Sequence, residues 1–584
     1  MILKALYDYY HRCGNLPSSG MEEKEIGFLL VISKEGKFIR FEDCRVDNKN
    51  GRTYLVKKHV GRSSAVVANY LYDNSAYVLG ISDRKDVSKL KEYNDKEQKC
   101  FDAFKANIVS IYNAFPSNLD LRTLVDFYEQ GREVIITEVS QDPLWEDIKK
   151  NLSKKYSTFS FRIEGDTRII AEKQEILQLE DGNNAGTDLC LVTGEHGEIV
   201  DTTTATMIPG SQATAKLVAF QVNSGYDSYG KSKCGNAPIS KDAEFAYTTA
   251  LNTMLGKDSH NKFRVGNRTF LFWASSNNDA AEQVEERFFD LVGFSEESND
   301  DPNAKVDQVK KVFTAIYSGS LKTNMDDRFY ILGLAPNSAR IAVVYWSETS
   351  LKDFAGMILK HFDDMEIIDG RKEKKPYIGI RSIISEVTRH NNDGSWINNV
   401  TPNLPEAVIK SIFQGLEYPY SLFSACIRRL RAECMDKDGI RICRIAILKA
   451  YLNRTNDKNK KIEKMLDKSN TNQGYLCGRL FAVLDKIQED ANHTNTIRER
   501  YMNAASSTPA SVFATILNLS SHHQENLPNE ARKVFFEKIK QEIIDKISAD
   551  GFPAHLDLQD QGRFFVGYYH QRQDFFSKKE DNNE

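Results

Sequence analysis

The chain has 584 residues, of which 41% are hydrophobic and 27% charged, and this length predicts roughly two to four domains. A formal net charge of -4 and a pI of about 6.3 exclude a uniformly basic nucleic-acid-binding protein, so any basic binding surface has to be local. The lack of a long apolar run argues against a membrane span, and nine scattered cysteines without a C-x-x-C pair indicate reduced thiols in a cytoplasmic protein.

The first 350 residues are expected to mix strands and helices. Two segments, 26–46 and 328–346, each hold a pair of extended runs around a turn, which predicts two hairpins. Two further β-rich runs and one helical stretch lie between them, at 216–222, 269–275 and 244–255. We therefore predict an α+β N-terminal region over residues 1–350, built as one or two subdomains.

A polar segment follows, and residues 351–402 are predicted to be a linker with connecting segments. From residue 403 to 584 the apolar residues recur at helical spacing, which predicts an all-α bundle. Two helical faces carry this prediction, one with Leu476, Leu480, Val483, Leu484 and Ile487, the other with Val534, Phe535, Ile539, Ile543 and Ile547. The predicted fold class is α+β, with a mixed N-terminal region followed by a helical bundle.

The segment Gly225–Ser232 matches the letters G-x-x-x-x-G-K-S of a phosphate-binding P-loop. Such a loop needs a helix that starts at its Lys-Ser, so that backbone N–H groups face the phosphates. Here Gly235 and Pro238 fall within what would be the first two helical turns, and Tyr226 and Tyr229 are bulky for a close backbone approach. We interpret the match as accidental. The segment is either an ordinary flexible, polar loop or, through Lys231, Lys233 and Asn236, part of a surface that contacts nucleic acid.

Catalytic and metal-binding motifs are not apparent in the sequence. No set of residues forms a nucleophile, a base and an orienting group, which favours a binding or scaffold protein over an enzyme. A zinc site from Cys190, His196 and Cys234 is conceivable, but zinc ligands usually come in tighter pairs. We predict no catalytic residue, no cofactor and no metal site.

Positive charge concentrates in two places. Residues 52–80 combine Lys57, Lys58 and Arg62 with Asn69 and Asn74, a mixture in which cations suit phosphates and amides suit base edges. Residues 426–461 hold eleven Lys/Arg against four Asp/Glu, which would suit two basic helices along a phosphate backbone. In both places an ordinary solvated surface is an equally good interpretation.

The C-terminal stretch 557–576 is rich in aromatic residues. Phe565, Tyr569, Arg572 and Phe576 share one helix face, and such a face could stack on single-stranded bases. An apolar stripe packed into the bundle is the interpretation we favour.

Eight stretches follow one another along the chain: "MILKALYDYY", "GRSSAVVANYLYDNSAYVLGI", "LCLVTGE", "SYGKSKCGNAPISKDAEFAYTTALN", "YILGLAPNSARIAVVYW", "RRLRAE", "KAYLNR" and "QGRFFVGYYHQRQDFF". Together they resemble the large subunit of subtype I-C CRISPR interference complexes, often called Cascade. The resemblance runs from residue 1 to about residue 576. None of the stretches is a catalytic motif, and the specificity comes from their number and shared order.

The resemblance implies a non-catalytic subunit of a ribonucleoprotein complex for antiviral defence. Such a subunit lies at the 5′ end of the CRISPR guide RNA, inspects target double-stranded DNA for a protospacer-adjacent motif, and helps to start the R-loop. Its helical domain would line the path of the displaced strand. The expected partners are the guide RNA, target DNA, the Cascade backbone, 5′-end-capping and small subunits, and a recruited helicase-nuclease, with no membrane.

Carried onto this sequence, the resemblance suggests three groups of DNA-binding residues. The first would read the motif, the second would assist it, and the third would hold the backbone of the opened strands: Lys57, Lys58, Arg62, Asn69 and Asn74; Tyr229, Lys231, Lys233 and Asn236; Arg428, Arg429, Arg441 and Arg444. Residues 1–350 would then serve motif recognition and docking in the complex. The alternatives are a scaffold subunit without direct DNA recognition and, least favoured, an NTPase that uses Gly225–Ser232.

The resemblance to subtype I-C members also implies a separate small subunit, which is made from inside the large-subunit gene. Met465 opens the last helical block and is the best-placed start for such a product, which would span residues 465–584. Met435 and Met502 are less well placed. The alternative is that Met465 is an ordinary linker residue.

Overall fold

The computed structural model describes residues 1–576, apart from residues 15, 19, 48–49, 61–65, 84–89, 155, 178–187, 222–224, 226–228, 293–303, 371–377, 434–439, 456–460 and 495. The chain forms two compact units that alternate along the sequence. Unit 1 consists of Met1–Arg12, Ala205–Leu217 and Leu251–Glu584, and unit 2 consists of Cys13–Thr204 and Val218–Ala250. The fold class is α+β, as predicted.

Unit 2 is built around a four-stranded sheet with the order β3-β2-β6-β5. The predicted hairpin is confirmed as β2 (Phe28–Ile32) and β3 (Phe38–Asp43), with its turn at Ser33–Gly36. All five side chains of β2 are buried because this strand lies inside the sheet, parallel to β6 (Thr158–Ile163). The edge strand β5 (Tyr72–Asn74) runs antiparallel to β6.

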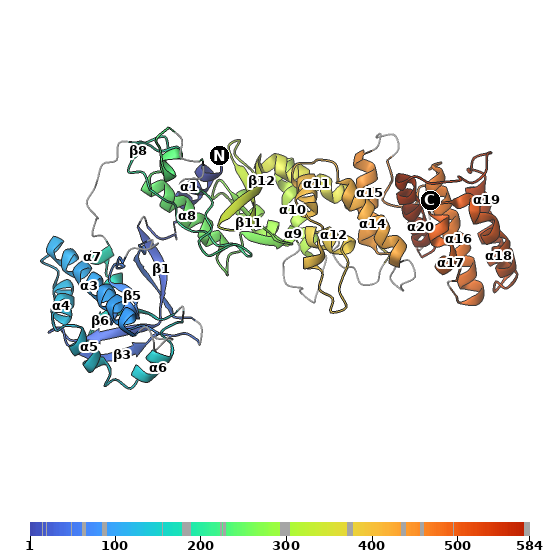
Figure 1. Ribbon diagram of the computed structural model, residues 1–584. Helices are drawn as coiled ribbons and strands as arrows, with labels where there is room; N and C mark the ends of the chain where they lie inside the picture. The colour runs from blue at the N-terminus through green and yellow to red at the C-terminus, as the bar shows by residue number, and fades with distance from the viewer. Residues whose placement is uncertain are drawn as a thin grey trace. The chain divides into compact units, whose positions relative to one another are not determined.

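Helices complete the core of unit 2. Their apolar side chains join those of the sheet in one cluster, which includes Phe101, Phe104, Phe127 and Phe161. The helices are α2 (Ser75–Val78), α3 (Leu90–Ala114), α4 (Leu119–Glu129), α5 (Arg132–Val139), α6 (Trp145–Lys150) and α7 (Gln174–Leu177). Figure 1 shows them in blue and cyan.

The remaining strands of unit 2 pair in twos. β1 (Met21–Ile26) lies antiparallel to β4 (Arg52–Lys57), and the short β7 (Asp188–Leu189) lies antiparallel to β8 (His196–Gly197). The 3-10 helix η3 (Lys233–Asn236) precedes α8 (Lys241–Leu255), which confirms the predicted helix and contains the boundary between the two units.

Unit 1 begins with an antiparallel sheet of the order β12-β11-β10-β9. The second predicted hairpin is confirmed as β11 (Arg328–Asn337) and β12 (Arg340–Ser350), where Ser338 adopts a left-handed φ of 53° in the turn. The other strands are β9 (Lys262–Val265) and β10 (Arg268–Ala274). Helix α1 (Ile2–Arg12) joins this unit, since Arg12 Nη1 donates to Ser276 O at 3.2 Å and Arg12 Nη2 lies 3.3 Å from Glu285 Oε1.

The core of unit 1 continues from the sheet into the helices. In chain order these are α9 (Asp279–Val292), α10 (Ala304–Ser318), α11 (Leu351–Met365), α12 (Ile380–Val387), α13 (Leu404–Phe413), α14 (Tyr420–Glu433), α15 (Ile442–Thr455), α16 (Gln473–Asn492), α17 (Thr496–Ala505), α18 (Phe513–Glu525), α19 (Glu530–Ile544) and α20 (Leu558–Asp574). Residues 351–402, predicted to connect the two regions, contain α11 and α12, and both helices bury apolar residues in this core.

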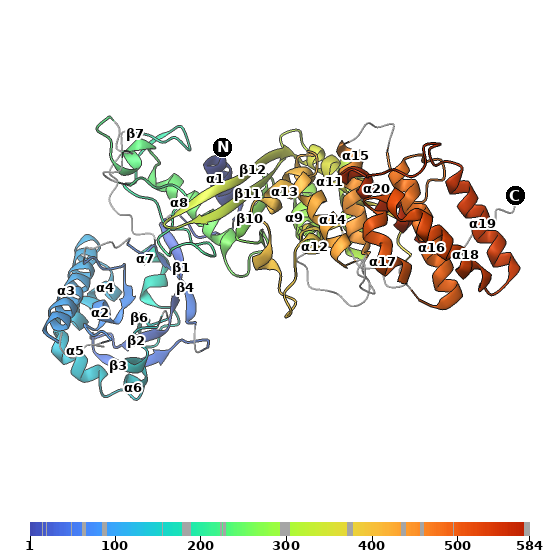
Figure 2. The same ribbon diagram turned by 45° about the vertical axis from the view of Figure 1, so that its right-hand side comes forward.

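Helices α16 and α20 form the centre of the C-terminal helices, with α17, α18 and α19 packed on α16 (Figures 1 and 2). Their backbones come very close, because glycines face the contact. A Cβ atom on Gly478 would lie 1.9 Å from Phe564 O, and one on Gly567 would lie 2.3 Å from Tyr475 O. The aromatic residues of α20, among them Phe564, Phe565, Tyr568 and Tyr569, are buried, which confirms the packed interpretation of this stretch.

One predicted strand was wrong, and one predicted helix face is confirmed only in part. Residues 216–221 form no strand beyond an isolated bridge between Lys216 and Arg340, because no neighbouring strand extends the pairing. On α19, Ile543 is buried and Ile539 and Ile547 pack against the core as predicted. Val534 and Phe535 are exposed, however, and Phe536 and Lys540 are buried, so the buried face is rotated from the predicted one.

Candidate nucleic-acid interface

The first predicted loop lies in unit 2 between β4 and β5, and Glu22 of β1 fixes its ends. Glu22 Oε2 lies 2.7 Å from His59 Nδ1, and Glu22 Oε1 accepts hydrogen bonds from the Tyr72 hydroxyl at 2.7 Å and from the His59 N–H at 3.2 Å. Burial alone would raise the pKa of Glu22, but the hydrogen bonds from His59 and Tyr72 outweigh it, and the pKa lies below its usual value. Both ends of the loop are therefore hydrogen-bonded to the same charged side chain, that of Glu22.

The two lysines at the end of β4 have different surroundings. The Lys57 ammonium lies 4.4 Å from the centre of the Tyr70 ring, in cation–π contact. Lys58 Nζ donates to Thr204 Oγ1 at 2.8 Å and lies 3.3 Å from Glu244 Oε2 on α8. Lys57, the last residue of β4, thus contacts Tyr70 of the loop, whereas Lys58 ties the loop to α8.

The two asparagines also make local contacts. Asn69 is 8% exposed, its Oδ1 accepts the N–H of Val60 at 3.0 Å, and its own N–H donates to Asp73 Oδ2 at 2.9 Å. Asn74 is exposed and caps α2, because its Oδ1 accepts the N–H of Ala76 at 3.0 Å. Arg62 lies outside the described residues.

The second predicted loop places an aromatic and a basic residue at its tip. Tyr229 is fully exposed and adopts a left-handed φ of 54°, Gly230 follows with a φ of 73°, and Lys231 is exposed. The loop leads into η3, and no helix begins at Lys231 and Ser232, since α8 starts only at Lys241. The P-loop match therefore lacks the helix N-terminus that phosphate binding of that kind requires.

The base of this second loop is held by several bonds. Lys233 Nζ lies 2.8 Å from Asp201 Oδ2, and the N–H of Cys234 donates to Asp201 O at 3.2 Å. Asn236 Nδ2 donates to Lys233 O at 3.1 Å and to Lys231 O at 3.3 Å. Lys233 and Asn236 thus fix the base, while Tyr229 and Lys231 project from it.

Among the described residues, no group of three His, Cys, Asp or Glu side chains comes together as a metal site. Cys190 instead accepts the N–H of Ser240 at 3.3 Å. Burial would raise the pKa of this thiol, but hydrogen bonds from Ser240 and Thr193 lower it to about 7.

The third predicted group lies in unit 1 on α14, on α15 and, for Arg441, directly before α15, and its arginines differ in exposure. Arg428 is exposed, Arg441 keeps 45% of its side-chain surface exposed, and Arg429 is ion-paired with Glu433 one turn along α14. Arg444 is 2% exposed and belongs to the core. Its Nη2 lies 2.6 Å from Glu433 Oε2, and its Nε lies 3.2 Å from Glu386 Oε2 and donates to Glu386 O at 3.0 Å.

Burial and neighbouring charges disfavour the protonated form of two arginines of this third group, Arg444 and Arg429. Desolvation lowers the pKa of Arg444, which Glu386 partly offsets. The pKa of Arg429 is lowered by desolvation and then by the positive charges of Arg444, Arg441 and Arg389. The positive charges of these arginines therefore lie close enough to act on one another.

Sequence reasoning missed two members of this group. Glu386 lies on α12, and Arg389 follows two residues after that helix. Both fall in the segment 351–402 that we predicted to connect two regions. The apolar residues Ile380, Ile383, Ile384 and Val387 recur at helical spacing and could have revealed α12.

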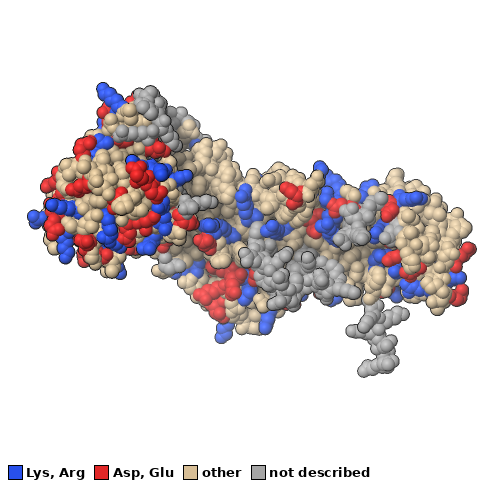
Figure 3. Space-filling view, turned by 90° about the horizontal axis from the view of Figure 1, so that it is seen from below, with Lys and Arg blue, Asp and Glu red and all other residues tan. Residues whose placement is uncertain are grey.

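The charge distribution on the surface agrees with a local rather than a global basic interface. On the face shown in Figure 3, basic and acidic residues are interspersed.

Met465 is half exposed in the segment between α15 and α16, and the five helices α16–α20 follow it. In the part of the chain that the structure describes, no helix is both long and apolar enough to cross a membrane.

A family model described as CRISPR-associated protein (Cas_Csd1) matches residues 6–576. No curated protein matches the chain.

Proposed function

We propose that the chain, which belongs to the Cas_Csd1 family of CRISPR-associated proteins, recognises a protospacer-adjacent motif for a subtype I-C Cascade complex. In this role it is the non-catalytic large subunit, which starts the R-loop and acts in the cytoplasm. Guide-RNA pairing then supplies most of the sequence specificity, and the protein reads only the short motif and the shape of the duplex.

The observation that carries the proposal is the tip of the second loop. Tyr229 is fully exposed, a position that costs hydrophobic free energy in an isolated protein, and Lys231 stands two residues away. An exposed aromatic ring suits contact with bases, and an adjacent ammonium suits a phosphate. The bonds of Lys233 and Asn236 hold the base of the loop, so the tip is presented on a fixed support.

Both candidate loops belong to unit 2, and one contact joins them. Lys58 at the start of the first loop lies 3.3 Å from Glu244, and Glu244 is on α8, the helix that follows the second loop. Because both loops are attached to α8, they can contact one duplex with their positions fixed relative to each other. We assign phosphate contact to Lys57 and Lys231, base contact to Tyr229 and Asn74, and support of the loops to Lys58, Asn69, Lys233 and Asn236.

The helical part of unit 1 is proposed to hold the opened strands through exposed arginines, such as Arg428 on α14 and Arg441 directly before α15. The further partners of the complex are the guide RNA, the backbone, 5′-end-capping and small subunits, and the recruited helicase-nuclease. The proposed chain binds DNA and leaves cleavage to that nuclease.

The test uses complexes assembled with guide RNA, with and without this chain. Binding is measured to matched duplexes that keep or scramble the flanking motif. We expect Tyr229→Ala with Lys231→Ala to remove the preference for the intact motif, at a cost of roughly 1–3 kcal/mol for each base that no longer stacks on the protein. Tyr420→Ala, at another exposed tyrosine, is the control and should leave the preference unchanged.

Two results would contradict the proposal. If complexes without the chain distinguish the two duplexes as well as complete ones, motif recognition belongs to another subunit and this chain is a scaffold. If the loop variants keep the full preference, recognition lies outside the second loop.

A further inference from the structure

Five charged side chains form a series of alternating arginines and glutamates where α12, α14 and α15 meet. In order they are Arg429, Glu433, Arg444, Glu386 and Arg441, and each carboxylate serves two guanidinium groups. Glu433 bridges Arg429 and Arg444, and Glu386 bridges Arg444 and Arg441. The buried Arg444 therefore lies at the centre of the series, and Arg429 and Arg441 lie at its two ends.

Among the described residues, this series of charges is not neutral. Three guanidinium groups face two carboxylates, and Arg389 adds a fourth positive charge that acts on Arg429. Within the same described part of the chain, Arg429 Nε, Arg444 Nη1 and Glu386 Oε2 are buried atoms without a hydrogen-bond partner. Hydrogen bonding inside the cluster is therefore incomplete, and the described carboxylates do not balance its positive charge.

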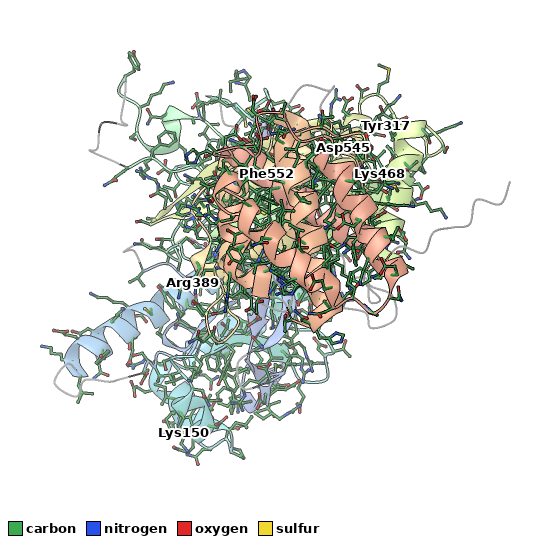
Figure 4. All side chains as sticks on the ribbon, turned by 90° about the vertical axis from the view of Figure 1, so that its right-hand side faces the viewer. Lys150, Tyr317, Arg389, Lys468, Asp545 and Phe552 are labelled. Atoms are coloured by element: carbon green, nitrogen blue, oxygen red, sulfur yellow. The ribbon has the colours of Figure 1, made fainter. Side chains whose placement is uncertain are left out.

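The accessible members of the cluster lie at its ends. Arg441 keeps 45% of its side-chain surface and Arg429 keeps 24%, whereas Arg444 keeps 2%. Arg389 is exposed and lies at the periphery of the helices of unit 1 in Figure 4. An anion at the surface would therefore meet Arg389, Arg429 and Arg441, with Arg444 as support beneath them.

The chemistry of these groups favours a phosphate over a single carboxylate. Arginine forks match the oxygens of a phosphate, and three forks can share its several acceptors. The loop that carries Arg389 also carries Trp396, whose ring lies 6.2 Å from the His390 ring at an interplanar angle of 17° and 6.0 Å from the Arg381 guanidinium. Aromatic rings beside arginines are the surroundings in which unpaired bases stack.

We propose that Arg389, Arg429 and Arg441 form a site for one phosphodiester group of a single-stranded nucleic acid. The proposal rests on the proposed function for the presence of such a strand, and it adds the site, its anchor on Glu386 and Glu433, and the neighbouring aromatic loop. In the unbound protein the two glutamates neutralise part of the cluster, and the bound phosphate supplies the negative charge that is missing.

The experiment measures binding of a fluorescent oligothymidylate to the full chain as a function of salt. Each phosphate contact to a single strand contributes about 0.7 to the slope of log affinity against log salt concentration. The double variant Arg389→Gln with Arg441→Gln should therefore lower the slope by about 0.7, because both arginines serve the same phosphate. The control Arg500→Gln, at an exposed arginine of α17, should leave the slope unchanged.

A second variant works in the opposite direction and cannot be mimicked by misfolding. Glu433→Gln removes a competing carboxylate from Arg429, so oligothymidylate should bind several-fold more tightly. An unchanged slope in the double variant, or no gain in Glu433→Gln, overturns the proposal. It is also overturned if the double variant loses binding to polyglutamate but keeps oligothymidylate binding, since the site would then take an acidic protein partner.

The same variants separate this inference from the proposed function. If the wild-type complex prefers the intact motif and the double variant keeps its salt slope, only the phosphate site is refuted. If the double variant loses slope while the wild-type complex shows no preference, the phosphate site is supported and motif recognition is refuted.

Discussion

Side chains of the kind that bind nucleic acid also hold this fold together. Lys449, on α15, is 2% exposed and its Nζ donates to the backbone carbonyls of Asp363 at 3.2 Å and Asp364 at 3.0 Å. Arg479 is fully buried between Gln571 and Glu542. A sequence shows that these residues are basic, but their burial depends on partners 60 to 90 residues away. That is why Arg444 looked the same in the sequence as the exposed Arg428.

A buried histidine makes the stability of unit 1 depend on pH. His361 is fully buried on α11, with Nδ1 at 2.7 Å from the Tyr418 hydroxyl and Nε2 at 2.9 Å from Ile378 O. Burial lowers its pKa to about 4. The unfolded chain takes up this proton near pH ~6.5, so the contribution to stability is present above that pH and is lost as the pH falls toward 4, by about 1.4 kcal/mol per pH unit.

We expect His361→Gln to reduce this pH dependence. The measurement is urea unfolding of the full chain between about pH 6.5 and about pH 5, followed by hydrogen exchange of α11 amides. The control His555→Gln replaces an exposed histidine and should keep the wild-type dependence. Equal pH dependence in wild type and His361→Gln would show that His361 is not the group responsible.

The local sequence pattern predicted the hairpins and most helices. It failed where contacts between distant parts of the chain determine strand pairing or the buried face of a helix. β2/β3 and β11/β12 were predictable because each turn and both strands lie within about 20 residues. The parallel pairing of β2 with β6 joins residues more than 120 positions apart, and no local signal specifies it. On α19, similar apolar residues on adjacent faces left the choice to its packing partner.

The glycine contact between α16 and α20 is a testable property of the two helices. Gly478→Ala would place a Cβ 1.9 Å from Phe564 O and 2.9 Å from Tyr568 N, so the backbones would have to separate. Alanine is the better helix former by about 1 kcal/mol, yet we expect a net loss of roughly 1–3 kcal/mol from overpacking. Thermal unfolding of the full chain measures the effect.

Gly356→Ala on α11 is the matched control. There the added Cβ meets only the Tyr317 ring, at 2.9 Å, and Tyr317 is 55% exposed and free to turn outward. The variant should be neutral or slightly stabilising. If Gly478→Ala behaves like Gly356→Ala, the close backbone approach does not limit the packing of these helices.

At the scale of the whole molecule, the division into units does not follow sequence blocks. Unit 1 collects three separate segments, and one boundary lies inside α8. Composition along the chain could not reveal this, because a unit is defined by contacts between distant segments. The candidate loops at 57–74 and 229–236 nevertheless belong to one unit, as a common role in binding requires.

A separate product of residues 465–584 stays a prediction. Helix α16 packs on α17, α18, α19 and α20, and α20 also packs on α14 and α15, where Gly562 lies beside Phe423 and Leu452. We expect Met465→Leu to abolish a C-terminally tagged product of this length in cells, detected by immunoblot and mass spectrometry, while the full chain remains.

Met502→Leu is the control for an internal start. Met502 is buried in α17, and a product that begins there would lack α16, the centre of the bundle. Its substitution should leave the short product in place. A short product that persists in Met465→Leu would place the start elsewhere or attribute the product to proteolysis.

The contacts of α1 have a consequence for synthesis on the ribosome. This amphipathic helix emerges before the sheet of unit 1, and Arg12 finds Ser276 and Glu285 only after more than 260 further residues have been made. At 5–20 residues per second this delay is roughly 15 to 55 s. Throughout that time the nascent chain carries the apolar face of α1 without the sheet that will cover it. We expect this first helix to be the segment that a ribosome-bound chaperone protects.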